Sequence, residues 1–135
     1  MAEEEREKLF SGWVAQKALI IRDGKALISL DKNQSNWDIP GGRVHVGEEP
    51  RAGLVREIKE EIGADVEVGE VYHVGFIGAS RFLIVYHVTL KNPEQEFSLA
   101  EDEIAKVMWV GKGEYADLPM WDEYRALLDR FFSEH

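Results

Sequence analysis

Two apolar runs near the start of the chain predict a β-hairpin. Val14–Ile21 and Ala26–Leu30 are rich in aliphatic residues, and only the polar segment Arg22-Asp23-Gly24-Lys25 separates them. An Asp-Gly pair between two such runs is the signature of a tight turn between antiparallel strands. The pattern therefore predicts a strand, a turn and a second strand.

The next segment is expected to be mostly extended and irregular. Trp37–Ile39 should be extended, because Pro40 disfavours helix in the residue before it. Gly41-Gly42 then permits backbone angles that other residues resist. A brief strand is expected at Arg43–Val46.

Residues 50–62 have the period of an amphipathic helix. Pro50 suits the first helical turn, and Gly63 is a typical terminating residue. With about 100° per residue, one stripe is predicted to face the core, and it consists of Arg51, Val55, Ile58 and Ile62. Three carboxylates are expected on the opposite side, from Glu57, Glu60 and Glu61.

The second half of the chain predicts three strands and a helix. The strands are expected at Val66–Ile77, Arg81–Leu90 and Lys106–Val110, and a polar loop covers Lys91–Ala100. The second of these strands is apolar on both faces, which is typical of a strand covered on both sides. A helix is expected after Pro119, with an apolar face made of Tyr124, Leu127, Leu128 and Phe131. Together the elements predict the α/β class, as a three-layer α/β/α sandwich around a mixed β-sheet.

The length and composition fit a single domain. The chain has 135 residues, of which 44% are hydrophobic and 31% charged, and no apolar run approaches the ~18 residues of a membrane span. Residues 1–12 form a charged lead-in, with a helical turn at Glu3–Leu9 as an option, and they do not resemble a secretory signal. The absence of cysteine excludes disulfides and thiolate chemistry. We expect a cytoplasmic protein with no membrane partner.

The charge of the chain limits its partners. The formal net charge is −10, so binding of long nucleic acid, which needs clustered Lys and Arg, is not expected. A small polyanionic substrate would also be repelled unless a cation intervenes.

The glutamates of the predicted helix have two interpretations. Most acidic helix faces are simply solvated, and like charges at i,i+3 and i,i+4 repel weakly. A bound divalent cation would turn that repulsion into attraction. The surrounding residues favour the second interpretation: Gly42, five residues, Glu48, seven residues, Arg56-Glu57-Ile58, then Glu60-Glu61 and Gly63-Ala64.

This spacing resembles the signature of the Nudix hydrolases, G-x5-E-x7-R-E-U-x-E-E-x-G-U, in which U is an aliphatic residue. The chain matches it from Gly42 to Gly63, and the last position is Ala64 where a larger aliphatic is usual. The lead-in Trp37–Gly41 also resembles the family. The resemblance implies hydrolysis of a pyrophosphate bond in a nucleoside diphosphate linked to another group, by water attack at phosphorus.

The resemblance also implies a metal site for Mg²⁺ or Mn²⁺, which favour hard oxygen ligands. Glu60 and Glu61 correspond to the principal ligands, and the backbone carbonyl of Gly41 is a further candidate. Glu57 is expected either to bind metal or to take the proton from the attacking water. Arg56 is expected to orient Glu57 or a neighbouring carboxylate.

The remaining motif residues and one acidic cluster have less specific assignments. Glu48 is expected either to pair with Arg56 or to join the metal shell, whereas Gly42 and Gly63 serve geometry. Family members often recruit an acidic residue outside the motif. Glu101-Asp102-Glu103 is the obvious cluster, and Glu103 is the favoured member, with a solvated loop as the alternative.

The substrate is left open by the sequence. Arg43 and Arg81 are candidates for phosphate contacts, with surface ion pairs as the alternative. Four aromatic residues are candidates to stack on a base, although strand aromatics usually lie in the core; they are Trp37, Phe76, Phe82 and Tyr86. Nucleoside triphosphates and nucleotide sugars remain equally open, and a homodimer is possible. The runner-up interpretation is a Nudix-fold domain that binds a nucleotide-like ligand without catalysis.

Overall fold

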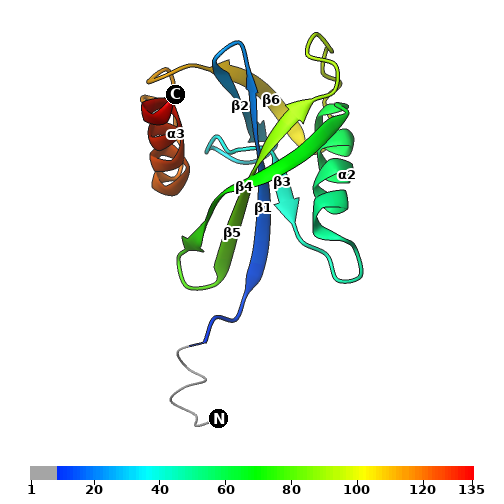
Figure 1. The fold of residues 1–135 in the computed structure, drawn as a ribbon, viewed down its shortest axis with the longest axis vertical. Helices are drawn as coiled ribbons and strands as arrows, with labels where there is room; N and C mark the ends of the chain where they lie inside the picture. Colours follow the sequence, from blue (N-terminus) through cyan, green and yellow to red (C-terminus); the bar gives the residue numbers. More distant parts are fainter. Residues whose placement is uncertain (1–8) are drawn as a thin grey trace.

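The structure is a computed structural model that describes residues 9–135, and it places one mixed β-sheet between two helices (Figure 1). The expected α/β/α sandwich is confirmed. The helical turn expected at Glu3–Leu9 lies outside the described residues, except for Leu9. The elements in chain order are β1 (Trp13–Arg22), β2 (Lys25–Asp31), β3 (Gly41–Arg43), α2 (Pro50–Ile62), β4 (Val66–Ile77), β5 (Arg81–Leu90), β6 (Ile104–Val110) and α3 (Asp122–Glu134).

The predicted hairpin forms, but its two strands separate soon after the turn. Asp23 and Gly24 both have positive φ, as a tight turn between right-twisted strands requires. β1 and β2 pair only beside this turn, at Ile21↔Ala26 and Arg22↔Lys25. Farther along, β1 pairs in parallel with β5, and β2 pairs with β6, giving the order β4-β5-β1-β2-β6. The sheet is therefore split between β1 and β2.

The short strand β3 lies beside β1 on the side of the split. It pairs antiparallel with β1 through Gln16↔Gly42, so the strand expected at Arg43–Val46 is placed too late in the chain. The reason is the close approach of the backbones, because a Cβ at Gly41 would lie 2.1 Å from the Gln16 carbonyl oxygen. A residue with a Cβ at position 41 could not approach β1 this closely.

Each face of the sheet is covered by one helix (Figure 1). Successive side chains of a strand point to opposite faces, and β1 shows this directly. Ala18 and Ile20 pack in the core under α2, whereas Ala15 and Leu19 pack in the core under α3. The strand β5 contributes to both cores in the same way, which confirms that it is covered on both sides.

The buried side of α2 differs from the predicted stripe. Arg51 is exposed and Val55 is only half-buried. The guanidinium of Arg51 instead donates to the Gly69 carbonyl and lies over the Tyr86 ring. The side chains that enter the core recur at every fourth position, and they are Leu54, Ile58 and Ile62. Glu61 is also buried, so it lies beside the core stripe and not opposite to it as predicted.

The C-terminal half follows the sequence prediction closely. The bounds of β4 and β5 coincide with the expected strands, and β6 begins at Ile104, two residues before the expected start at Lys106. The predicted apolar face of α3 is buried, including Tyr124 and Phe131. Within residues 9–135, no helix combines the length and apolar character needed to cross a membrane.

Candidate active site

The glutamate-bearing helix α2 is fixed at both ends. At its start, the Glu49 side chain accepts a hydrogen bond from the Ala52 amide at 2.8 Å, and Pro50 occupies the first turn. At its end, Gly63 adopts a left-handed conformation, and its amide donates to the Lys59 carbonyl. The two caps thus define the first and last turns of the helix, between which its glutamates lie.

Arg56 joins the glutamates of the loop and the helix. Its guanidinium donates to both carboxylate oxygens of Glu48, at 2.7 and 2.9 Å, and to Glu60 Oε2 at 2.9 Å. Its Nη2 also lies 3.6 Å from Glu57 Oε1. The hydrogen bonds from Arg56 lower the pKa of Glu48. Of the two roles left open for Glu48, the structure shows the pairing with Arg56.

Gly42 makes room for the carboxylate of Glu57. A Cβ at Gly42 would lie 2.2 Å from Glu57 Oε2 and 2.5 Å from the carboxyl carbon. The φ angle of Gly42 is not positive, so close approach is the reason for glycine here. Glu57 therefore rests directly on β3, and its side chain is only 15% exposed.

Glu57 and Glu61 form a close pair of carboxylates one helical turn apart. Glu61 is 9% exposed, and burial raises its pKa to about 9. The neighbouring Glu57 raises the pKa further through hydrogen bonding and charge, while Lys17 acts in the opposite direction. Burial and the neighbouring carboxylate thus favour either the protonated form of Glu61 or a bound cation.

In the metal-free protein, we expect Glu61 to lower stability as the pH rises. Its folded-state pKa of about 9 lies above the ordinary value of 4.5, so between these values the folded protein holds a proton that the unfolded chain releases. Unfolding therefore becomes easier as the pH rises through this interval. Each tenfold change in acidity corresponds to about 1.4 kcal/mol, so Glu61→Gln should gain at least about that much in free energy of unfolding at pH 8.

Denaturant titrations of both proteins in chelator, repeated between pH 4.5 and pH 9, check this expectation. The gain should shrink toward the lower end of the range, where the unfolded chain also begins to hold this proton. A difference that stays constant with pH would contradict the assignment of the raised pKa to Glu61.

The acidic cluster outside the motif lies beside Glu61. A cavity of about 270 Å³ is lined by Glu61, Asp102 and Glu103, whereas Glu101 does not line it. The Ala100 amide donates to the Glu61 carbonyl at 2.8 Å, which holds this loop against the end of α2. The structure thus places the favoured Glu103 in the same cavity as Glu61, and the catalytic role of Glu103 stays a prediction.

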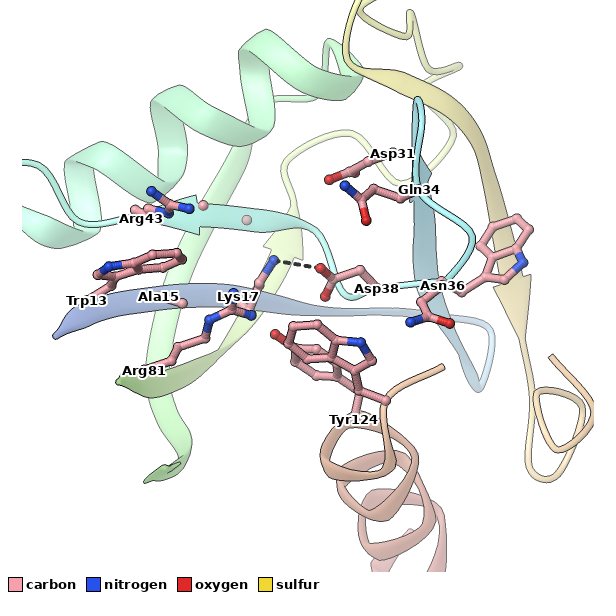
Figure 2. Close-up of a pocket in the computed structure, with 14 residues that line it drawn as sticks. Trp13, Ala15, Lys17, Asp31, Gln34, Asn36, Asp38, Arg43, Arg81 and Tyr124 are labelled. Atoms are coloured by element: carbon pink, nitrogen blue, oxygen red, sulfur yellow. Dashed lines mark hydrogen bonds and ion pairs between the residues drawn. The ribbon is translucent and has the colours of Figure 1, made fainter. Parts of the chain in front are cut away.

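A larger cavity of about 350 Å³ opens at the split between β1 and β2 (Figure 2). Both arginines proposed for phosphate contacts line it. The Arg43 guanidinium lies 3.5 Å from the centre of the Trp13 ring, and that of Arg81 lies 5.3 Å from the same ring and 4.7 Å from the ring of Trp121. Gly41 and Gly42 also line this cavity, so one of its walls is the strand against which Glu57 rests.

Several lining residues were missed by the sequence analysis. Lys17 Nζ and Asp38 Oδ2 form an ion pair at 3.1 Å, and both residues line the cavity (Figure 2). Two signals were available: Lys17 interrupts an apolar run, and Asp38 separates two buried apolar residues. Trp121 and Tyr124 come from the distant start of α3 and carried no local signal. Among the four aromatic candidates for base stacking, only Trp37 lines the cavity.

The residues present fit a hard divalent cation. Among residues 9–135, no three His, Asp or Glu side chains are already arranged around one metal position. Glu57 and Glu61 nevertheless provide adjacent oxygen donors whose mutual repulsion a cation would relieve. The Glu60 side chain is 59% exposed, and its Oε2 is paired with Arg56, which leaves Oε1 as the oxygen that could bind a metal. The roles as metal ligands stay predictions.

Comparisons with known proteins agree with this geometry. The NUDIX domain family model matches residues 14–131. The CTP pyrophosphohydrolase of Escherichia coli (strain K12) is 32% identical over 124 residues, covering 82% of this chain and 89% of that protein. Nudix hydrolase 2 of Arabidopsis thaliana is 34% identical over 121 residues, and the match spans 82% of this chain but only 43% of the plant protein.

A solved structure supports the same fold. The MutT protein of Methanosarcina mazei Go1 superimposes with a TM-score of 0.76 at 23% identity, covering 93% of this chain and 96% of that one. The family match extends from the second residue of β1 into α3 and so includes the whole sheet. The chain therefore belongs to the NUDIX domain family of hydrolases.

Proposed function

We propose that this Nudix hydrolase catalyses the divalent-metal-dependent hydrolysis of a pyrophosphate bond in a nucleoside diphosphate linked to another group. The observation that carries the proposal is the arrangement around β3. The strand separates a cavity lined by Arg43 and Arg81 from the Glu57–Glu61 pair. A phosphate chain bound by the arginines would run past the glycine pair toward these carboxylates.

The carboxylates of Glu57 and Glu61 would hold Mg²⁺ or Mn²⁺, together with Glu60 and the backbone oxygen of Gly41. When bound, the cation would neutralise phosphate charge and lower the pKa of a coordinated water. That contribution matters for this chain, because its net charge of −10 otherwise opposes the binding of a polyanion.

The protein's own groups would position and deprotonate the nucleophile. A water oxygen forms a bond to phosphorus, the bridging P–O bond breaks, and the proton of the water passes to a carboxylate. Glu57 is the proposed base because its carboxylate is fixed against Gly42 and is only partly exposed. Glu103 is the alternative base, since it lines the cavity next to Glu61. Arg56 acts by holding Glu48, Glu57 and Glu60 in place.

The substrate class rests on the same cavity. Arg43 and Arg81 offer charge for phosphates, while the rings of Trp13 and Trp121 offer flat surfaces at its rim. A relative over most of this chain is named for pyrophosphohydrolysis of CTP. We infer that a nucleoside triphosphate or a similar nucleotide is the substrate.

The test is a panel of nucleoside triphosphates, nucleotide sugars, ADP-ribose and dinucleoside polyphosphates, scored by phosphate products. We expect turnover of at least one class with millimolar Mg²⁺ or Mn²⁺, and its loss in excess chelator, because the cation would neutralise the phosphate charge that this acidic protein otherwise repels. Full activity in chelator would contradict the proposed metal dependence. Nucleotide binding without turnover would favour the non-catalytic alternative.

A further inference from the structure

The wall of the larger cavity contains a hydroxyl group that the protein itself does not use. The Tyr124 side chain extends from the start of α3 toward Lys17 and Asp38 (Figure 2). The residue is 1% exposed, and its Oη makes no hydrogen bond. The hydroxyl is close enough to Asp38 and Arg81 for both to influence its pKa, yet neither reaches hydrogen-bonding geometry.

An unpartnered buried hydroxyl destabilises the folded state, because it has lost its bonds to water. A phenylalanine would fill the same space without that cost. Tyr115 shows the contrast, since its hydroxyl bonds to Asp129 Oδ1. The hydroxyl of Tyr124 therefore has unused hydrogen-bonding capacity in the wall of the cavity, and its oxygen is covered in the absence of a ligand.

Asp38 places hydrogen-bond acceptors beside this hydroxyl. Its Oδ1 accepts from the Ile39 amide at 2.6 Å, and its Oδ2 accepts from Lys17 Nζ at 3.1 Å. Each carboxylate oxygen can accept a second hydrogen bond. The side chain is 29% exposed, whereas that of Lys17 is only 11% exposed. The ion pair with the buried lysine thus fixes the orientation of Asp38. The Asp38 carboxylate can still accept hydrogen bonds from a ligand.

Flat aromatic surfaces lie at the opening of the same cavity. Trp13 and Trp121 are 43% and 38% exposed, and the Arg81 guanidinium approaches both rings. The Arg43 guanidinium already lies over the Trp13 ring, and the Trp121 ring stacks with that of Tyr124, so a planar ligand ring would stack on the parts of these indoles that stay exposed. A ligand with a planar ring could stack on the indoles at the opening. Its polar edge could at the same time form hydrogen bonds with Asp38 and Tyr124 in the wall.

We propose that Asp38 and Tyr124 recognise the exocyclic amino group of a nucleobase, so that the preferred substrates carry cytosine, guanine or adenine and not uracil. The inference rests on the proposed function and names the substrate class. In cytosine, the amino group would donate to Asp38, and the adjacent ring nitrogen would accept from the Tyr124 hydroxyl. Uracil presents a carbonyl oxygen at the first position, which would face the carboxylate and be repelled.

The decisive experiment compares ligands that differ by one amino group. Binding of CMP and UMP, and separately of GMP and IMP, is measured by titration calorimetry on the full chain, without any requirement for turnover. We expect CMP to bind about tenfold or more tightly than UMP, and GMP more tightly than IMP. Equal affinities within each pair, or no binding of any of the four, would overturn the proposal.

Two variants locate the discrimination. Asp38→Asn replaces a carboxylate oxygen by an amide donor, so the CMP preference should disappear or reverse; Asp117→Asn, an exposed control with the same charge change, should keep it. Tyr124→Phe should weaken CMP binding without lowering the thermal midpoint, whereas the control Tyr115→Phe should lower the midpoint and leave CMP binding intact. If Asp38→Asn fails to fold because Lys17 loses its ion pair, the comparison of Tyr124→Phe with Tyr115→Phe tests the proposal.

The outcomes also separate this inference from the proposed function. Turnover of CTP and UTP with similar kcat/KM would overturn the amino-group recognition and leave pyrophosphate hydrolysis standing. An inactive nucleotide panel combined with selective CMP binding would contradict pyrophosphate hydrolysis and leave the amino-group recognition standing. A Tyr124→Phe variant that is less stable than the wild type, with CMP binding unchanged, would show that the hydroxyl serves the fold and would overturn its role here.

Discussion

Glu61→Gln should lower kcat by about 10²- to 10³-fold, the range seen when one group that stabilises developing charge is removed. The carboxylate lies one helical turn from Glu57 at the cavity wall, and the amide cannot supply the same negative charge to a cation. Glu60→Gln should also reduce kcat, since Glu60 belongs to the same set of oxygen donors. Steady-state kinetics at saturating Mg²⁺, with a fixed nucleotide substrate, check this expectation.

The matched control is Glu67→Gln, which makes the same change at an exposed position of β4. It should leave kcat unchanged. Thermal unfolding must accompany the kinetics, because Glu61→Gln is expected to be at least as stable as the wild type. A wild-type rate in both Glu60→Gln and Glu61→Gln would contradict the assignment of these glutamates to the metal.

Gly42→Ala should reduce kcat by about 10²-fold, the scale expected when a catalytic group is displaced by roughly 1 Å. The added Cβ would lie 2.2 Å from Glu57 Oε2, so the carboxylate must move away from β3. The backbone of Gly42 is not left-handed, and alanine therefore adds no conformational strain of that kind. Comparison of kcat and KM for the wild type and the variant measures the effect.

Gly75→Ala is the control for this change, because Gly75 lies in β4 and a Cβ there meets only the end of the His73 side chain. Its activity should match that of the wild type. Rapid catalysis by Gly42→Ala would show that the position of Glu57 is not critical. Equal loss in both variants would point to a general effect of alanine on the sheet.

The elements with strong local signals were predictable from the sequence. β4 and β5 begin and end where the apolar pattern does, and α2 runs from Pro50 to the residue before Gly63. These segments combine a clear period with turn or cap residues at their ends, so local and tertiary preferences agree. The motif spacing likewise identified the helix that carries the glutamates.

The burial of Glu61 was not predictable from the helical period. The prediction assigned the core side of α2 to a stripe containing Arg51 and Val55, which placed the three glutamates opposite. The helix is in fact rotated so that Leu54 packs in the core, and Glu61 becomes buried at the edge of that contact. The rotation depends on how α2 meets the sheet, which no local pattern in the helix records.

The larger cavity was also not predictable from the sequence, because segments that lie far apart in the chain form its walls. Lys17 comes from β1, Asp38 from the loop before β3, and Tyr124 from α3. They meet only because β1 and β2 separate after two residue pairs and the loop enters the split. Charged residues inside apolar segments were the one local sign of this site.

The most direct test of the proposed chemistry is hydrolysis of a nucleoside triphosphate in ¹⁸O-labelled water with Mg²⁺, followed by mass analysis of the products. Water attack at the bond between the α- and β-phosphates, which is the pyrophosphate bond of the nucleoside diphosphate moiety, predicts nucleoside monophosphate and pyrophosphate, with one ¹⁸O atom in one of the two products. The label and the products should both be lost in Glu61→Gln. Release of orthophosphate and nucleoside diphosphate, or products without label, would contradict the proposed reaction.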